Sequence, residues 1–261
     1  MEQEFEKQFE NPDSQFRGAP FWAWNCKLDK EMMTRQIEYF KEMGLGGFHM
    51  HCRTGLDTPY MSEEYLEVVK ACVEKAKQEK MYAWLYDEDR WPSGAAGGLV
   101  TKDRQYRARY LVFCPWKQEE MPPSHQTHGS SMRHLAQQGN GKLLARYQVQ
   151  IQDGVLKSYK RLSEGEEIPC GGQTWYVYEE IAPDSGWFND QAYLDTLNPK
   201  AVERFIEETH EAYYRAVGEE FGKTVPAIFT DEPQFTWKTT LGDPFSDGDV
   251  FLPWSGDLPN T

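Results

Sequence analysis

The most constraining feature of this sequence is the alternation, in its first hundred residues, of short apolar runs with amphipathic helical patterns. Apolar runs at 21–24, 46–52 and 81–87 predict strands, and the patterns at 29–43 and 62–80 predict helices. Strands that alternate with helices of this length pair in parallel, because each helix carries the chain back across one face of the sheet. The first third of the chain therefore predicts an α/β fold.

The period of the apolar residues changes in the middle of the chain. Segments 110–113, 143–151 and 174–178 are typical of short antiparallel strands, and a polar stretch at 117–141 follows the first of them. We interpret residues 106–182 as a β-rich insertion after the third strand.

A helical pattern returns at Asn198-Pro199, where proline suits the first helical position, and continues to about residue 221. A fourth strand is expected at 225–230, whereas the last residues are dense in Gly, Pro, Asp and Thr and show no helical period. The fold class predicted is a partial (β/α)8 TIM-type barrel of about four strands. Its expected parts are a first half of the barrel at 1–105, the insertion at 106–182, a barrel helix and fourth strand at 183–233, and an irregular tail at 234–261.

Composition excludes several classes of partner. The net charge is −14, and the sequence lacks the clustered Lys and Arg that neutralise nucleic-acid phosphates. Nucleic acid is therefore excluded as an expected partner. No apolar run reaches the 18 residues of a membrane span, and the first fifteen residues are polar and acidic, unlike a secretory signal, so a cytoplasmic location is expected. The five cysteines show no CxxC spacing, which favours reduced thiols over a disulfide framework or a zinc site.

Candidate functional residues lie where the four expected strands end, because a parallel barrel gathers its chemistry at the carboxyl ends of its strands. All four ends are polar or aromatic. The catalytic candidates are Asp87, Glu88 and Glu232. The candidates for substrate binding are Trp24, Asn25, His49, His51, Arg53, Asp89, Arg90, Trp91 and Asp231.

Carboxylates clustered on neighbouring strand ends suit glycoside hydrolysis, which needs one carboxylic acid at the leaving oxygen and one carboxylate acting at the anomeric carbon. Glu232 is the first choice for the acid, because the following Pro233 stiffens its turn. Trp24 and Trp91 are candidates for stacking on a sugar ring. Capping of the following helix, or pairing with Arg90, is the competing structural interpretation of these carboxylates.

His49 and His51 are two residues apart on an expected strand, so their side chains share one face. Two functions and one structural role are open for the pair. They could hold a metal ion, as in metal-dependent amidohydrolase-type barrels, or hydrogen-bond sugar hydroxyls beside Arg53. Alternatively, each could be a histidine satisfied inside the core.

Five segments, at 21–25, 46–51, 84–94, 193–199 and 228–234, together resemble glycoside hydrolase family 106, known chiefly for α-L-rhamnosidases. The resemblance covers about 20–104 and 185–235. It implies a barrel catalytic domain, an inverting mechanism, a carbohydrate substrate and calcium dependence.

The chain differs from that family in length, because family members continue for several hundred residues. The expectation is therefore a chain that stops before its barrel closes, with the outer edges of the first and fourth strands unpaired and inward-facing Phe48, Met50 and Trp84 uncovered. Self-association, or a separate partner carrying the missing half, would cover them. On this view isolated activity is negligible, and a non-catalytic half-barrel is the third hypothesis.

Overall fold

A computed structural model describes residues 2–121, 141–168, 171–235, 238–241, 243, 245, 248–256 and 258 of the chain. The greater part of the polar stretch predicted at 117–141 lies outside the described residues. The chain divides into two compact units, one formed by Met1–Val100 with Glu203–Pro233 and the other by Thr101–Val202 with Gln234–Thr261. The fold is mixed α/β, with one parallel and one antiparallel sheet.

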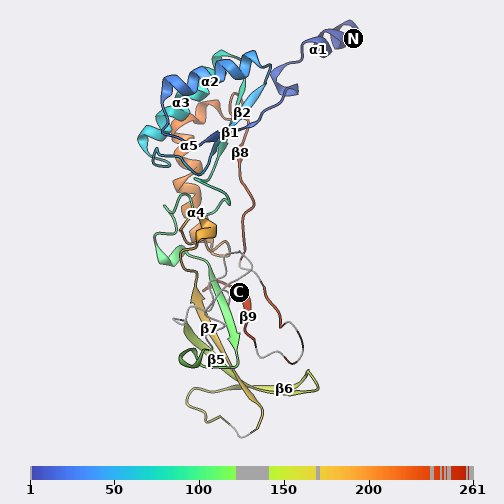
Figure 1. The fold of residues 1–261 in the computed structure, drawn as a ribbon, viewed down its shortest axis with the longest axis vertical. Helices are drawn as coiled ribbons and strands as arrows, with labels where there is room; N and C mark the ends of the chain where they lie inside the picture. Colours follow the sequence, from blue (N-terminus) through green and yellow to red (C-terminus); the bar gives the residue numbers. More distant parts are fainter. Residues whose placement is uncertain are drawn as a thin grey trace. The chain divides into compact units, whose positions relative to one another are not determined.

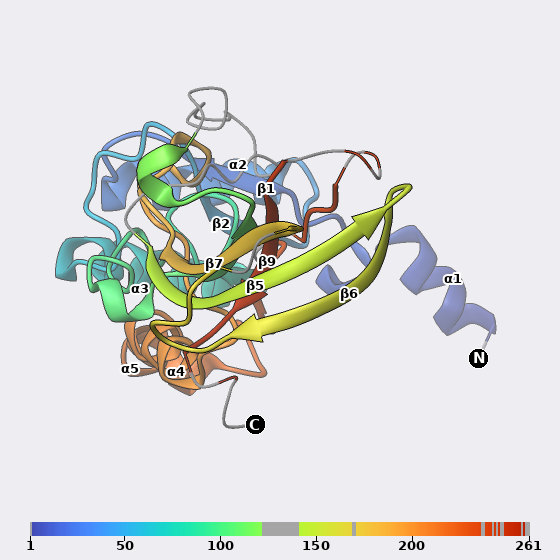
Figure 2. The same cartoon turned by 90° about the horizontal axis from the view of Figure 1, so that it is seen from below.

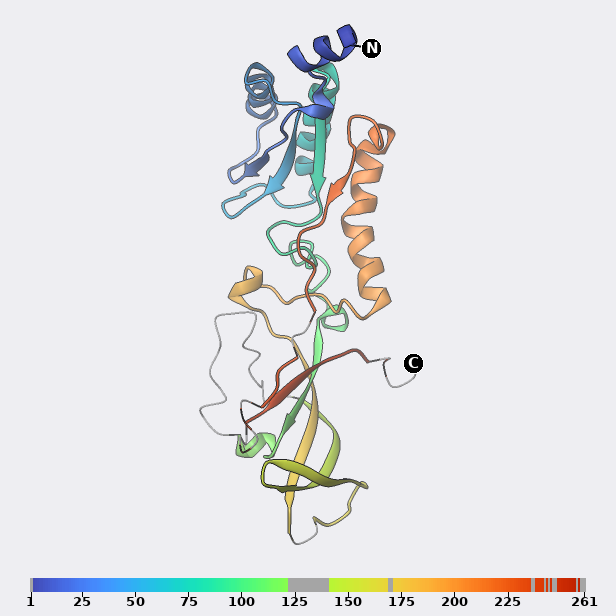
Figure 3. The same ribbon diagram turned by 90° about the vertical axis from the view of Figure 1, so that its right-hand side faces the viewer.

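The first unit contains a four-stranded parallel sheet in the order β1-β2-β3-β8 (Figures 1 and 3). Each pairing is parallel, including the pair of β3 and β8, in which Tyr86 stands opposite Phe229. The prediction of four parallel strands is therefore confirmed for these residues, whereas closure into a barrel stays a prediction. The strands are β1 (Phe21–Trp24), β2 (Gly47–Cys52), β3 (Tyr82–Tyr86) and β8 (Ile228–Phe229).

Helices α2 and α3 begin at side-chain caps. Asp29 accepts a hydrogen bond from the N–H of Met32 at 2.8 Å, and Ser62 accepts one from the N–H of Tyr65 at 3.1 Å. Such caps satisfy backbone donors that the first helical turn leaves unpaired. The helices of this unit are α1 (Glu2–Glu10), η1 (Ser14–Phe16), α2 (Lys30–Glu42), α3 (Glu63–Gln78), α5 (His210–Val217) and η6 (Gly218–Glu220).

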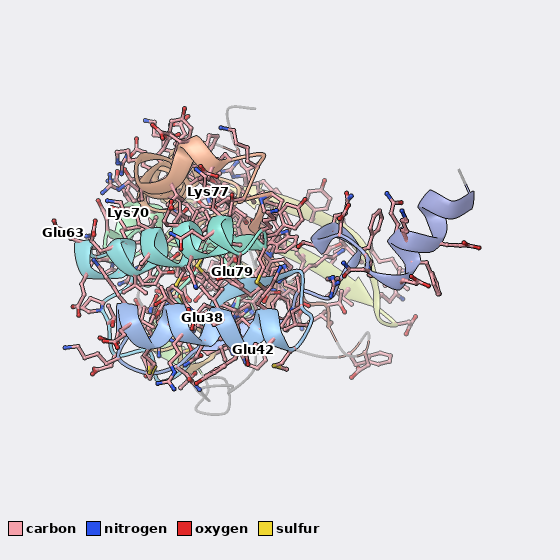
Figure 4. The ribbon with its side chains drawn as sticks, turned by 90° about the horizontal axis from the view of Figure 1, so that it is seen from above. Glu38, Glu42, Glu63, Lys70, Lys77 and Glu79 are labelled. Atoms are coloured by element: carbon pink, nitrogen blue, oxygen red, sulfur yellow. The ribbon has the colours of Figure 1, made fainter. Side chains whose placement is uncertain are left out.

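The outward faces of α2 and α3 are charged, as Figure 4 shows for Glu38, Glu42, Glu63, Lys70, Lys77 and Glu79. Lys75 of α3 joins the two helices, because its Nζ lies 2.7 Å from a carboxylate oxygen of Glu38 in α2. It also pairs with Glu79, at the end of its own helix, at 2.8 Å. The opposite faces of these helices are apolar and cover one side of the parallel sheet.

The helix predicted at 199–221 is divided in two, which corrects the sequence interpretation. Helix α4 (Pro199–Glu208) ends one residue before α5 begins, and Thr209 lies between them with φ −114° and ψ −74°. The hydroxyl of Thr209 donates to the carbonyl of Phe205 at 2.7 Å. Bonding of this kind, from a threonine to the residue four positions earlier, bends helices.

The second unit is built on a five-stranded antiparallel sheet in the order β6-β5-β7-β4-β9 (Figure 2). The three strands predicted inside the insertion fall within β4, β5 and β7. The strands are β4 (Arg109–Cys114), β5 (Lys142–Gln152), β6 (Val155–Leu162), β7 (Gln173–Ile181) and β9 (Val250–Trp254), and the short helices are η2 (Arg104–Tyr106), η3 (Gln118–Glu120) and η5 (Gly186–Phe188).

Strand β9 corrects the expectation of an irregular tail at 234–261. It pairs antiparallel with β4, so that Phe251 stands opposite Val112 and Pro253 opposite Tyr110. Phe251 is 3% exposed and packs against Tyr110 in the core of this unit. Pro253 is tolerated because β9 is an edge strand, where a missing N–H need not interrupt a ladder.

Residues 183–202, which were expected to belong with the barrel helix, lie in the second unit together with the tail. Among the residues that the structure describes, no helix has the length and apolar character needed to cross a bilayer.

Candidate functional site

The two faces of the parallel sheet differ in what covers them. Trp22 packs against Phe40 of α2, and Trp24 packs against Tyr65 of α3, so both indoles point toward the helices. Trp24 is 0% exposed, which contradicts its predicted role of stacking on a sugar. Residues two apart on a strand share a face, but a short apolar run does not reveal whether that face is covered by helices or lies on the opposite side of the sheet.

Two residues of β2 are corrected in the same way. Phe48, expected to face inward, packs against Trp22 and Phe40 on the helix side, and Met50 is buried on that same side of the strand. The face opposite the helices, here called the aromatic face, carries Phe21, His49, His51, Trp84, Tyr86 and Phe229.

Both histidines are stacked within the aromatic face. His49 lies on Trp84 with ring centroids 4.9 Å apart, and His51 lies on Tyr86 at 4.0 Å. Burial lowers the pKa of His49 and of His51, and backbone carbonyls near their Nδ1 atoms oppose that shift. Both imidazoles are therefore mainly neutral at pH 7. His51 Nε2 lies 3.9 Å from a carboxylate oxygen of Asp231.

The histidine pair does not form a metal centre with its neighbours. In the described part of the chain, no group of three or more His, Cys, Asp and Glu side chains could hold a metal ion. A zinc hydrolase needs at least three protein ligands, so the metal-dependent amidohydrolase alternative finds no support in this geometry. Calcium takes six to eight oxygen ligands, including backbone carbonyls and waters, and the calcium dependence that the resemblance implies stays a prediction.

Asp87, at the end of β3, joins that strand to the end of β8. Its two carboxylate oxygens accept hydrogen bonds from the hydroxyls of Ser93 and Thr230, both at 2.6 Å, and His210 Nε2 lies 3.7 Å away. Asp87 is 0% exposed. Burial raises its pKa, and the two hydroxyl donors and His210 oppose that shift. These contacts suit a residue that positions the ends of β3 and β8, and they suit the predicted catalytic role less well.

Glu88 is enclosed by its own loop. Its Oε1 accepts from the N–H groups of Asp89 at 2.9 Å and Gly97 at 2.6 Å, and its Oε2 accepts from those of residues 94, 95 and 96 at 2.7 to 2.9 Å. Burial raises the pKa of Glu88 to about 7, against the lowering effect of these donors. A carboxylate engaged by five backbone donors and 1% exposed cannot reach a substrate, so the structure contradicts its predicted catalytic role.

Asp89 and Arg90 pair with each other. The guanidinium of Arg90 lies 2.8 to 2.9 Å from Oδ2 of Asp89, which is 8% exposed. Asp89 therefore has the structural role that the sequence left open for these carboxylates, which is pairing with Arg90. Asn25 and Arg53 are exposed at the ends of β1 and β2, and the Arg53 N–H donates to the Trp24 carbonyl at 3.0 Å.

Asp231 and Glu232 are the accessible carboxylates at the end of β8. The indole Nε1 of Trp91 donates to Oε2 of Glu232 at 3.3 Å, and Glu232 is exposed in a left-handed turn with φ 45°. The Asp231 side chain is 20% exposed. Burial, and then the charge of Glu232, raise the pKa of Asp231, while Arg53 lowers it.

A serine that sequence patterns did not single out holds these ends together. Ser93 donates its hydroxyl proton to Asp87, accepts from the N–H of Asp231 at 2.9 Å, and donates its own N–H to the Asp231 carbonyl at 2.8 Å. The contacts of Thr230 and His210 with Asp87 were not predicted either, because a threonine at a strand end and a histidine in a helix are both common. The structure thus brings together Asp87, Trp91, Asp231, Glu232 and His51. His49, two residues earlier in β2, stacks on Trp84 instead.

Comparisons with known proteins add little to this geometry. No family model matches the sequence, and no curated protein matches it. One solved structure, "Structure of Rhamnosidase from Novosphingobium sp. PP1Y", is similar at 23% sequence identity with a TM-score of 0.35. The matched region covers 41% of this chain and 11% of that one, and a similarity this weak supports no conclusion about fold or function.

Proposed function

We propose that the end of the parallel sheet in the first unit is the sugar site of a glycoside hydrolase acting on α-L-rhamnosides. The observation that carries the proposal is the accessible carboxylate of Glu232, held by the Trp91 indole next to the partly buried Asp231. The family resemblance of the sequence motifs supports the choice of sugar.

The chemistry assigns a separate role to each group. Glu232 protonates the leaving oxygen, because it is the exposed carboxyl group and a neighbouring donor fixes its orientation. Asp231 supplies the second carboxyl group, and its burial, followed by the charge of Glu232, raises its pKa. His51 is 3% exposed and its Nε2 lies 3.9 Å from Asp231, so it positions that carboxylate from beneath and does not itself contact the sugar.

The test is sugar binding at Trp91 followed by turnover. Methyl α-L-rhamnopyranoside is titrated into isotope-labelled chain, and the indole N–H resonance of Trp91, assigned with Trp91→Phe, is followed. We expect this resonance to shift, and the shift to disappear in Glu232→Gln. Glu219→Gln, which changes an exposed glutamate in η6, is the matched control.

Turnover is measured as nitrophenol released from the p-nitrophenyl α-L-rhamnoside. If the chain hydrolyses this substrate, we expect Glu232→Gln to lower the rate at least 100-fold. An unshifted Trp91 resonance at saturating sugar, together with no release of nitrophenol, would contradict the proposal.

Sugar binding without hydrolysis is a second candidate. The burial of Asp87 and Glu88 favours it, because it leaves fewer accessible carboxyl groups than the sequence predicts. Binding at Trp91 with no turnover in any condition would support this candidate.

A further inference from the structure

The second unit carries a separate apolar depression on the face of its sheet that lies opposite its core. The depression has a volume of about 270 Å³. We call it the aromatic groove, and it is lined by Phe113, Tyr147, Val149, Leu156, Tyr159 and Trp175.

The strand register places these side chains on one face. Tyr147 of β5 stands opposite Trp175 of β7, and Val149 stands opposite Tyr159 of β6. Their sequence neighbours point the other way, where Tyr176 and Tyr178 join Tyr110, Val112 and Phe251 in the core. Figure 2 shows β5, β6 and β7 side by side.

An antiparallel sheet with its core on one face is expected to be polar on the other, and here the second face is aromatic. Tyr159 is 69% exposed, and its ring centroid lies 6.4 Å from that of Tyr147 at an interplanar angle of 61°. The Nε1 of Trp175 donates to Gln173 at 3.3 Å. The polar atom of the indole is therefore satisfied beside the groove, and its ring contributes apolar surface.

The size of the groove and the polar residues beside it indicate its ligand. A stable protein interface buries more than about 1,000 Å², which six side chains around 270 Å³ do not provide. Small-molecule sites begin near roughly 300 Å³. The groove lies just below that volume, so it can take one ring and no larger ligand. The lining itself is apolar, and two polar residues, Arg161 and Gln173, stand beside it as the ladder partners of Tyr147 and Val149.

We propose that the aromatic groove binds one sugar unit of a carbohydrate chain, at a site distinct from the carboxylate pair in the first unit. A pyranose has an apolar face of C–H groups, which stacks on tyrosine and tryptophan rings, and a hydroxylated edge, which hydrogen-bonds to polar side chains beside them. The choice of a carbohydrate over another ring of this size rests on the proposed function.

Binding is measured with the full chain by affinity electrophoresis in gels containing a soluble rhamnose-bearing pectin, and by saturation-transfer NMR with methyl α-L-rhamnopyranoside. We expect Tyr159→Ala to weaken pectin binding by roughly ten-fold and Tyr159→Phe to change it less than about two-fold, because the ring provides the contact. Circular dichroism and thermal unfolding check the fold, which an exposed side chain should not affect. Phe245→Ala, also an exposed aromatic residue, is the matched control.

The glutamate variant separates the two sites. Pectin binding that survives Glu232→Gln and is weakened by Tyr159→Ala supports the groove. Binding lost in Glu232→Gln but unchanged in Tyr159→Ala overturns the groove and leaves the proposed function intact. If the folded chain is retarded in no pectin gel and shows no saturation transfer, the proposed groove site is overturned. The proposed function is then judged by nitrophenol release alone.

Discussion

The indole Nε1 of Trp91 donates a hydrogen bond to Glu232, a residue 141 positions later in the chain, at 3.3 Å. The bond joins the loop after β3 to the turn after β8 and orients the carboxylate that we assign to acid catalysis. Trp91→Phe keeps a ring but removes the donor, so we expect weaker sugar binding at this site with little change in stability. Sugar titration and urea unfolding measure the two effects, and Trp187→Phe in the second unit is the matched control. Unchanged affinity would show that the bond does not position Glu232.

Glu88 is expected to stabilise the loop around it. Glu88→Ala leaves five backbone N–H groups without their acceptor in a buried place, and we expect the free energy of unfolding to fall by about 2–4 kcal/mol. Glu88→Gln retains one oxygen and places an amide donor against N–H groups, so it should lie between the wild type and Glu88→Ala. Urea unfolding gives the values. A loss below 0.5 kcal/mol would mean that water replaces the carboxylate at no cost.

The stacked histidines should make the fold sensitive to acid. The pKa of His49 and of His51 is lowered by burial below the value of 6.5 typical of an exposed histidine. Protonation therefore favours the unfolded state, and the stability that these residues contribute is present above about pH 6.5 and lost as the pH falls through their folded pKa.

The measurement is the melting temperature from pH 7.5 to pH 5.0 for the wild type and for His51→Phe. The carboxyl groups whose pKa is raised, Asp87, Glu88 and Asp231, act in the opposite direction, because protonation favours the folded state for them. The comparison between the two proteins cancels that contribution. We expect the variant to lose less stability on acidification than the wild type, and parallel curves would contradict this account.

Strand β9 should be a stable part of the second unit. Phe251 is 3% exposed beside Tyr110, and Phe251→Ala should reduce the free energy of unfolding by about 3–5 kcal/mol. Phe245→Ala, which removes a ring that is 79% exposed, should change it by less than about 0.5 kcal/mol. Equal effects of the two variants would indicate that β9 is not packed in solution.

The parallel sheet could be predicted from the sequence because its signals are local. The apolar runs and the helical periods lie within windows of fewer than twenty residues, and the caps Asp29 and Ser62 stand beside the helices that they begin. Strand β9 could not be predicted, because what makes it a strand is a partner, β4, far away in the sequence.

The candidate site was predictable by residue type but not by role. Asp87, Glu88, Asp231 and Glu232 are all carboxylates at strand ends, and the sequence cannot distinguish them. Their roles depend on backbone N–H groups in the case of Glu88, and on the hydroxyls of Ser93 and Thr230 in the case of Asp87. Trp24 illustrates the same limit, since only packing against Tyr65 shows which face of β1 it occupies.

The hydrogen bond between Thr230 and Asp87 spans 143 residues of chain, and this separation has a consequence for folding. During synthesis β3 leaves the ribosome long before β8, so its outer edge lacks the partner strand while most of the second unit is being made. Closing so long a loop has a high entropic cost that is recovered only when the β3–β8 contacts form. We therefore expect β8 to dock late, after strands β4 to β7 of the second unit have been made, so that the final step in forming the first unit also assembles its carboxylate pair.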